Sequence, residues 1–197
     1  LCQQTCQDFE WLVIDDGSTD NTREVIAQYI AEHRIAIRYI WKENGGLYTG
    51  YNTAYTNITS PLNVCIDSDD FMPENAVELI FQTWNERGGE QYAGIIGLDF
   101  YADKKQPIGG YFPKDLNEVY LHDLYLYRIH LGDAKQVMRT DLMSHIAPQI
   151  GFPNEKDFNP IYMLLQVCDT LPLLVINENL CWVDYQKTGM AANIFKQ

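Results

Sequence analysis

The chain has 197 residues, of which 46% are apolar, and a formal net charge of −13 with a pI of about 4.5. This length and composition are typical of one globular domain with a substantial core, so we expect a single domain over residues 1–197. The acidic balance argues against binding to nucleic acid or to an anionic membrane surface. No stretch approaches the roughly 20 apolar residues that span a bilayer. The five scattered cysteines form no CxxC pair, which indicates a reducing, cytoplasmic setting.

Strands and helices are expected to alternate through the first hundred residues. Apolar runs predict strands over residues 11–14, 35–40, 62–66 and 93–101, the first and third of them buried. Helical spacing of apolar residues predicts helices that end near Ile30, run from about 47 to 57, and follow Pro73. This β-α-β-α-β order predicts an α/β, Rossmann-like fold with a mostly parallel central sheet and right-handed crossovers.

The pattern is less regular in the second half of the chain. We expect a loop over residues 104–113, a partly helical aromatic stretch over 115–129, a strand and a short helix over 135–143, a helix over 159–168, and one or two strands over 173–185. The aromatic stretch is compatible with either a core or a sugar-stacking wall. Its residues alone do not separate the two.

An acidic cluster, Asp67-Ser68-Asp69-Asp70, directly follows the third predicted strand. Carboxylates this close repel one another, so they need a cation, a set of hydrogen-bond donors or raised pKa values to coexist. Mg²⁺ and Mn²⁺ prefer oxygen ligands, and Mg²⁺ is typically held by one or two carboxylates together with substrate phosphates. The cluster therefore predicts a metal and phosphate site, and a solvated acidic loop is the alternative.

A second acidic turn, residues 15–20, follows the first predicted strand, and Asn44-Gly45-Gly46 follows the second. The turn is either a helix cap or part of a nucleotide pocket in which a carboxylate accepts hydrogen bonds from a base or a ribose. The glycines would let the backbone approach a ligand closely. Ligands of open α/β sheets bind at the carboxyl ends of the strands, where both acidic turns are expected.

These segments, in this order, resemble the family 2 glycosyltransferases of the GT-A fold. Residues 8–22 read DFEWLVIDDGSTDNT, which is similar to that family's first strand-and-turn motif. Residues 43–46 with Asn52 resemble its glycine-containing stretch, and residues 67–70 resemble its DxD motif. The resemblance implies a three-layer sandwich of the nucleotide-diphospho-sugar transferase type. It also implies that the first strand of the family, which would precede Leu1, is absent from this chain.

The resemblance assigns roles to individual residues. It implies that Asp15 or Asp16 contacts the nucleotide base and that Asp67 contacts the ribose. The full nucleotide-sugar set is Asp15, Asp16, Gly45, Gly46, Asn52, Asp67 and Ser68. Asp69 would bind Mg²⁺ or Mn²⁺, with Asp70 beside it. The catalytic base would be Glu155, with Asp157 as the second choice.

The activity implied is inverting transfer of a sugar from a nucleotide-sugar donor to a glycan or lipid-linked acceptor, in bacterial surface polysaccharide biosynthesis. Residues 1–100 would bind the donor, and residues 101–197 would shape the acceptor side. The expected location is the cytoplasm or the inner face of the membrane, with no nucleic-acid partner. Two alternatives stay open: a sugar-phosphate nucleotidyltransferase, and a non-catalytic or truncated GT-A-like binding domain.

Overall fold

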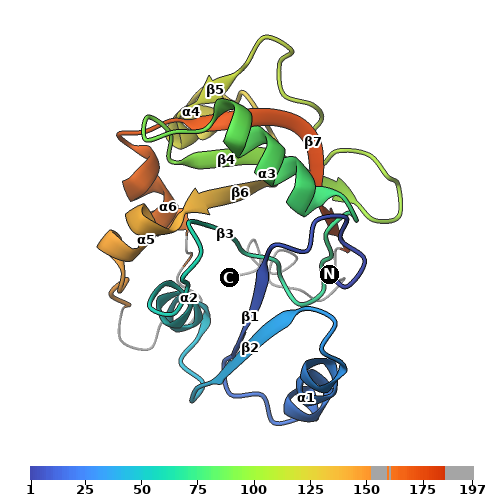
Figure 1. Ribbon diagram of the computed structural model, residues 1–197. Helices are drawn as coiled ribbons and strands as arrows, with labels where there is room; N and C mark the ends of the chain where they lie inside the picture. The colour runs from blue at the N-terminus through green and yellow to red at the C-terminus, as the bar shows by residue number, and fades with distance from the viewer. Residues whose placement is uncertain (152–158, 160, 185–197) are drawn as a thin grey trace.

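The strands among the described residues form two separate sheets. A computed structural model describes residues 1–151, 159 and 161–184 (Figure 1). Strands β1 (Glu10–Asp15) and β2 (Ala36–Trp41) form a two-stranded sheet. The second sheet has five strands in the order β3 (Leu62–Val64), β6 (Ala134–Arg139), β4 (Gly94–Tyr101), β7 (Leu173–Val183) and β5 (Glu118–Val119). The pair β1–β2 lies below the larger sheet in Figure 1.

Helices separate the first strands as the apolar spacing predicted. Helix α1 (Thr22–Glu32) follows β1, α2 (Leu47–Tyr55) follows β2, and α3 (Ala76–Arg87) follows β3. Strands β1 and β2 pair in parallel along their whole length, as a β-α-β unit requires. In the less regular half, α4 (Leu121–Leu126) follows β5, α5 (Thr140–Ile146) follows β6 directly, and α6 (Ile161–Cys168) precedes β7. The predicted strand-then-helix of residues 135–143 is thereby confirmed.

The five-stranded sheet is mixed. Strand β6 is antiparallel to both β3 and β4, and β7 is parallel to β4. Strands β3, β4 and β7 therefore run in the same direction, and β5 is antiparallel to β7. The simplest expectation was one parallel sheet in which β3 continues the β1–β2 pair. Instead β3 pairs with β6, and the Asn63 side chain donates a hydrogen bond to the carbonyl of Met138, 75 residues away.

Helices cover both faces of the larger sheet, which makes it the middle layer of three. Alternate residues of a strand point to opposite faces. Ile95, Val137 and Leu174 pack with α3 residues Ala76 and Ile80 on one face. Their neighbours Ile96, Met138, Leu173 and Val175 pack on the other face with residues from α4, α5 and α6: Leu121 and Leu124, Met143, Met163 and Val167.

The core lies in the second half of the chain rather than around the first strands. The first six residues of β4 are buried, whereas β3 and most of β1 are only half-buried. The prediction of buried strands at residues 11–14 and 62–66 therefore overestimated how far these strands are buried. The physical reason is the pairing: β1 has β2 as its partner and β3 has β6, so neither lies in the middle of a sheet. Within the described ranges, none of the helices is long and apolar enough to span a bilayer.

Candidate functional site

Asp15 closes strand β1 and is buried, with 4% of its surface exposed. Its Oδ1 accepts a hydrogen bond from the Ser18 backbone N–H at 2.7 Å, and its Oδ2 accepts one from the Tyr39 hydroxyl on β2. Burial raises the pKa of the Asp15 carboxyl, but these hydrogen bonds outweigh it and hold the pKa below its ordinary value. Asp15 is therefore an ionised carboxylate that fixes the turn after β1 to the neighbouring strand.

Asp16 joins the first acidic turn to the loop after β2. Its carboxylate accepts hydrogen bonds from Lys42 Nζ, from the Gly45 N–H at 3.0 Å and from the Gly46 N–H at 2.9 Å. The Asn44 side chain donates to the Asp16 carbonyl at 2.8 Å. Burial raises the pKa of Asp16, but the bonds from Lys42 and the two glycine amides lower it below its ordinary value. The sequence analysis did not single out Lys42, which is the cation of this contact.

The glycines of the two loops are required by the closeness of the backbones. Gly17 has a φ of +83°, and a Cβ there would lie 2.7 Å from the Asn44 nitrogen. Gly46 has a φ of +89° at the start of α2. Positive φ is readily adopted by glycine alone among the ordinary residues. Four of the predicted nucleotide-sugar residues, Asp15, Asp16, Gly45 and Gly46, thus belong to one connected structure, 15–18 with 42–46, in which both oxygens of each aspartate already have protein partners.

Asn52, on α2, holds a distant segment against the same region. Its side chain donates to the Gln149 carbonyl at 2.8 Å and accepts from the Gln149 N–H at 2.7 Å. Gly151 packs on Tyr48, whose ring would lie 2.2 Å from a Cβ at that position. Residues 149–151 therefore lie beside the first turns of α2. The predicted bases Glu155 and Asp157 lie outside the described residues.

The second acidic turn is exposed at its tip and anchored at its end. Asp67, Ser68 and Asp69 are exposed to solvent. The Asp70 N–H donates to the Asp67 carbonyl at 3.0 Å, and Asp70 Oδ1 accepts from the Asp184 N–H at 3.2 Å just after β7. Partial burial raises the pKa of Asp70. The anchoring of Asp70 to β7 leaves the carboxylates of Asp67 and Asp69 facing solvent, where a ligand has access to them.

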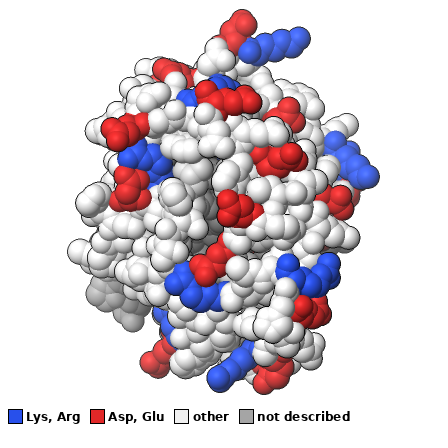
Figure 2. Space-filling model, in the orientation of Figure 1, with Lys and Arg blue, Asp and Glu red and all other residues white. Residues whose placement is uncertain are grey.

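The donor atoms of this turn suit a hard divalent cation that also binds phosphate. Across residues 1–151, 159 and 161–184, no three His, Cys, Asp or Glu side chains converge into a closed metal cage. Mg²⁺ in phosphate sites needs only one or two carboxylates, and it keeps waters or phosphate oxygens as its other ligands. The exposed carboxylate of Asp69 fits this open type of site. Figure 2 shows acidic and basic side chains interspersed over the described part of this face, and no continuous basic patch among them.

A buried ion pair lies beneath the acidic turn. Lys135 on β6 and Asp99 on β4 approach to 3.7 Å, and their side chains are 13% and 4% exposed. Burial raises the pKa of Asp99 to about 7, although the ammonium of Lys135 lowers it. The negative charges of Asp133, Asp70 and Asp67 act in the same direction as burial. Lys135 is therefore a buried cation close to the acidic turn, and no motif in the sequence pointed to it.

Residues 1–131 match the family described as Glycosyl transferase family 2. The chain belongs to this family. The matched region contains both acidic turns and the loop of residues 42–46, and it covers well over half of the 197 residues. The family resemblance drawn from three short motifs is thereby confirmed.

Several family 2 relatives are bacterial glycosyltransferases. The chain is 31% identical over 117 residues to the glycosyltransferase GlyA of Streptococcus pneumoniae, covering 51% of this chain and 16% of that protein. It is 32% identical over 122 residues to an uncharacterized glycosyltransferase of Nostoc, covering 60% of this chain and 38% of the relative. A match to the chondroitin synthase of Escherichia coli is 38% identical over 76 residues, covering 39% of this chain and 11% of that protein. The chain thus spans well under half of the length of these relatives.

Solved structures of TarS from S. aureus have the same fold. The structure in complex with UDP has a TM-score of 0.70 at 18% identity, over 94% of this chain and 54% of TarS 1–349. The complex with UDP-GlcNAc has a TM-score of 0.67 at 19% identity, over 97% of this chain and 54% of that one. These likenesses confirm the predicted fold class: an α/β domain of the GT-A type with helices on both faces of the central sheet.

Proposed function

We propose that this family 2 domain binds the nucleotide-sugar donor of a metal-assisted, inverting glycosyltransferase. The sugar would pass to a glycan or lipid-linked acceptor in the biosynthesis of a bacterial surface polysaccharide, at the cytoplasmic side of the membrane. The observation that carries the proposal is the exposed Asp67–Asp69 tip, anchored at Asp70 and set above a buried lysine. The family match and the likeness to TarS, solved with UDP, support it.

The exposed turn would bind the diphosphate end of the donor. Asp69, with Asp70 beside it, would hold Mg²⁺ or Mn²⁺, and a divalent cation at this position offsets the negative charge of a departing nucleoside diphosphate. Asp67 would accept a hydrogen bond from a ribose hydroxyl, and the Ser68 hydroxyl would donate one to the ribose or accept one from it. The loops 15–18 and 42–46 would form the other wall of the nucleotide pocket, with a rigid shape because Asp16 joins them.

The proton of the attacking hydroxyl needs a base on the acceptor side. We assign this role to Glu155, with Asp157 as the alternative. A carboxylate can take up the proton of the acceptor hydroxyl as that hydroxyl attacks the sugar. The contact of Asn52 with Gln149 supports the assignment, since it holds the residues that precede this segment against α2. Attack from the face opposite the leaving group inverts the configuration at the anomeric carbon.

A thermal-shift experiment with UDP or dTDP tests the donor site. A ligand at about one hundred times its Kd stabilises the folded state by roughly 2.7 kcal/mol, which raises Tm by several degrees for a domain of this size. We expect this rise with UDP or dTDP and Mn²⁺ together, and a much smaller one with the nucleotide alone. Asp69→Asn should remove the Mn²⁺-dependent part and leave the Tm of the free protein unchanged.

Asp115→Asn provides the matched control, because Asp115 is also an exposed aspartate but lies in the loop before β5. It should respond to nucleotide and Mn²⁺ as the unmodified protein does. If Asp69→Asn keeps the full Mn²⁺-dependent shift, the cation binds elsewhere. If no common nucleotide shifts Tm with any divalent cation, the domain is a non-catalytic member of the family and the proposal is wrong.

A further inference from the structure

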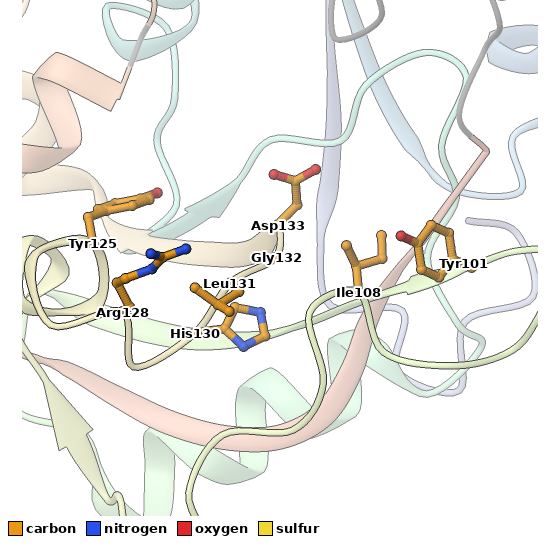
Figure 3. Close-up of a pocket in the computed structure, with 8 residues that line it drawn as sticks. All are labelled: Tyr101, Ile108, Tyr125, Arg128, His130, Leu131, Gly132 and Asp133. Atoms are coloured by element: carbon orange, nitrogen blue, oxygen red, sulfur yellow. The ribbon is translucent and has the colours of Figure 1, made fainter.

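A cavity of about 490 Å³ lies in the half of the chain that follows the acidic turn (Figure 3). Tyr101 at the end of β4 lines one side, and Tyr125 of α4 and Arg128 line the other. His130 and Asp133, from the segment between α4 and β6, also line the cavity. The volume lies within the usual range for small-molecule sites.

Two loops whose backbones touch contribute Ile108 and Gly132 to the lining of the cavity. A Cβ at Gly109 would lie 2.2 Å from the Gly132 nitrogen, and a Cβ at Gly132 would lie 2.1 Å from the Ile108 carbonyl oxygen. Gly109 also has a φ of +77°. Any other residue at either glycine would push the two loops apart. This contact fixes the positions of Ile108 and Gly132 in the wall of the cavity.

The lining combines flat apolar surfaces with polar groups that can face a hydroxylated ligand. One phenol ring belongs to Tyr101. The second phenol ring, the guanidinium, the imidazole and the carboxylate belong to residues 125–133. His130 is 8% exposed, and the centroid of its ring lies 4.7 Å from that of the Phe112 ring. Neither nitrogen of the His130 ring has a hydrogen-bond partner among the described residues. Buried polar groups nearly always have partners, and because both nitrogens are buried, a hydrogen bond between this imidazole and a bound molecule requires the His130 ring to turn toward the cavity.

The position of the cavity relates it to the proposed donor site. Asp133 lines the cavity, and β6 begins at the next residue. Lys135, the second residue of β6, forms the ion pair with Asp99. Asp99 lies close enough to Asp133, and also to Asp67, to respond to the charge of each. Asp99 and Lys135 therefore lie between the cavity and the acidic turn in the electrostatic sense, within range of charges in both.

We propose that this cavity binds a sugar ring of the acceptor glycan, with Tyr125 against one face of the ring and Asp133 on its hydroxyls. The proposal rests on the proposed function and adds the acceptor subsite to it. Tyrosine rings offer a rigid apolar surface to the C–H face of a sugar, while carboxylate, guanidinium and imidazole groups bind its hydroxyls. Nucleic acid is a poor fit for the site because the chain carries a net charge of −13.

Direct binding measurements test the cavity separately from the donor site. The probes are maltotriose and a chondroitin tetrasaccharide, followed by saturation-transfer NMR, and UDP with Mn²⁺, followed by calorimetry. The variants are Tyr125→Ala and Asp133→Asn. The matched control is Tyr127→Ala, because Tyr127 is 73% exposed, lies two residues from Tyr125 and is outside the cavity lining.

At least one saccharide should bind, and each cavity variant should weaken its binding about tenfold, the effect of losing about 1.4 kcal/mol. UDP affinity should stay the same in every variant, and Tyr127→Ala should bind both probes normally. Failure of both saccharides to bind, or equal binding to the protein and to both cavity variants, would overturn the proposal. If the saccharide effects appear but UDP with Mn²⁺ does not bind, the acceptor cavity stands and the proposed donor function fails.

Discussion

The buried pair Lys135–Asp99 gives the sharpest quantitative prediction. Replacing one partner of a buried ion pair leaves an uncompensated charge, but Asp99 can take up a proton, so the loss of unfolding free energy in Lys135→Met is limited to roughly 1.4 kcal/mol for each pH unit above about pH 7, or about 3 kcal/mol at pH 9. The reasons are specific: the side chains are 13% and 4% exposed, and Asp99 Oδ1 has no hydrogen-bond partner among the described residues. Without Lys135, the ionised carboxylate would be left almost unsolvated.

The loss should depend on pH in a definite direction. The pKa of Asp99 is raised from 3.8 to about 7 in the folded state, so its ionisation destabilises the fold as pH rises through this interval. Removing the ammonium of Lys135 raises this pKa further, and the decline then continues above about pH 7. Lys135→Met should therefore differ little from the unmodified protein near pH 6 and most at about pH 8 to 9.

Urea unfolding, followed by circular dichroism across this pH range, measures the effect. Arg34→Met is the matched control, because the Arg34–Glu32 pair is 3.9 Å apart but 56% and 48% exposed, and such surface pairs contribute about 0–1 kcal/mol. Asp99→Asn combined with Lys135→Met should recover most of the stability, since no unpaired buried charge remains. The reasoning is refuted if Lys135→Met costs no more than Arg34→Met at high pH.

Two further predictions concern the loops of the donor site and the catalytic base. Gly17→Ala should destabilise the fold by about 1–3 kcal/mol, because an alanine there has an unfavourable φ and its Cβ meets Asn44 at 2.7 Å. Gly110→Ala is the control: its φ is +93° with open space around it, so it should cost only roughly 1 kcal/mol of backbone strain. Equal losses of Tm in the two variants would contradict the close contact of residue 17 with Asn44. In turnover assays, Glu155→Gln should lower kcat by about 10²- to 10⁴-fold while donor affinity is unchanged, as expected for loss of a general base. If Asp157→Asn has this effect and Glu155→Gln does not, Asp157 is the base.

The sequence by itself determined the elements and the family. The strands before and after α1, the helices that follow β2 and β3, and the acidic turn at residues 67–70 were all predicted from short stretches of chain. These features depend on local periodicity and turn glycines, which a few consecutive residues specify. The family match over residues 1–131 likewise follows from short ordered motifs.

The tertiary structure decided which of these elements meet. Only the fold places β6 between β3 and β4, brings Asn52 to Gln149, and buries Lys135 against Asp99. The same is true of the cavity between residues 101–109 and 125–133. Each of these contacts joins segments that are far apart in the chain and have no pattern in common. Pairing of distant strands and burial of an ion pair depend on which surfaces pack together, and the spacing of residues along one strand or helix does not specify that.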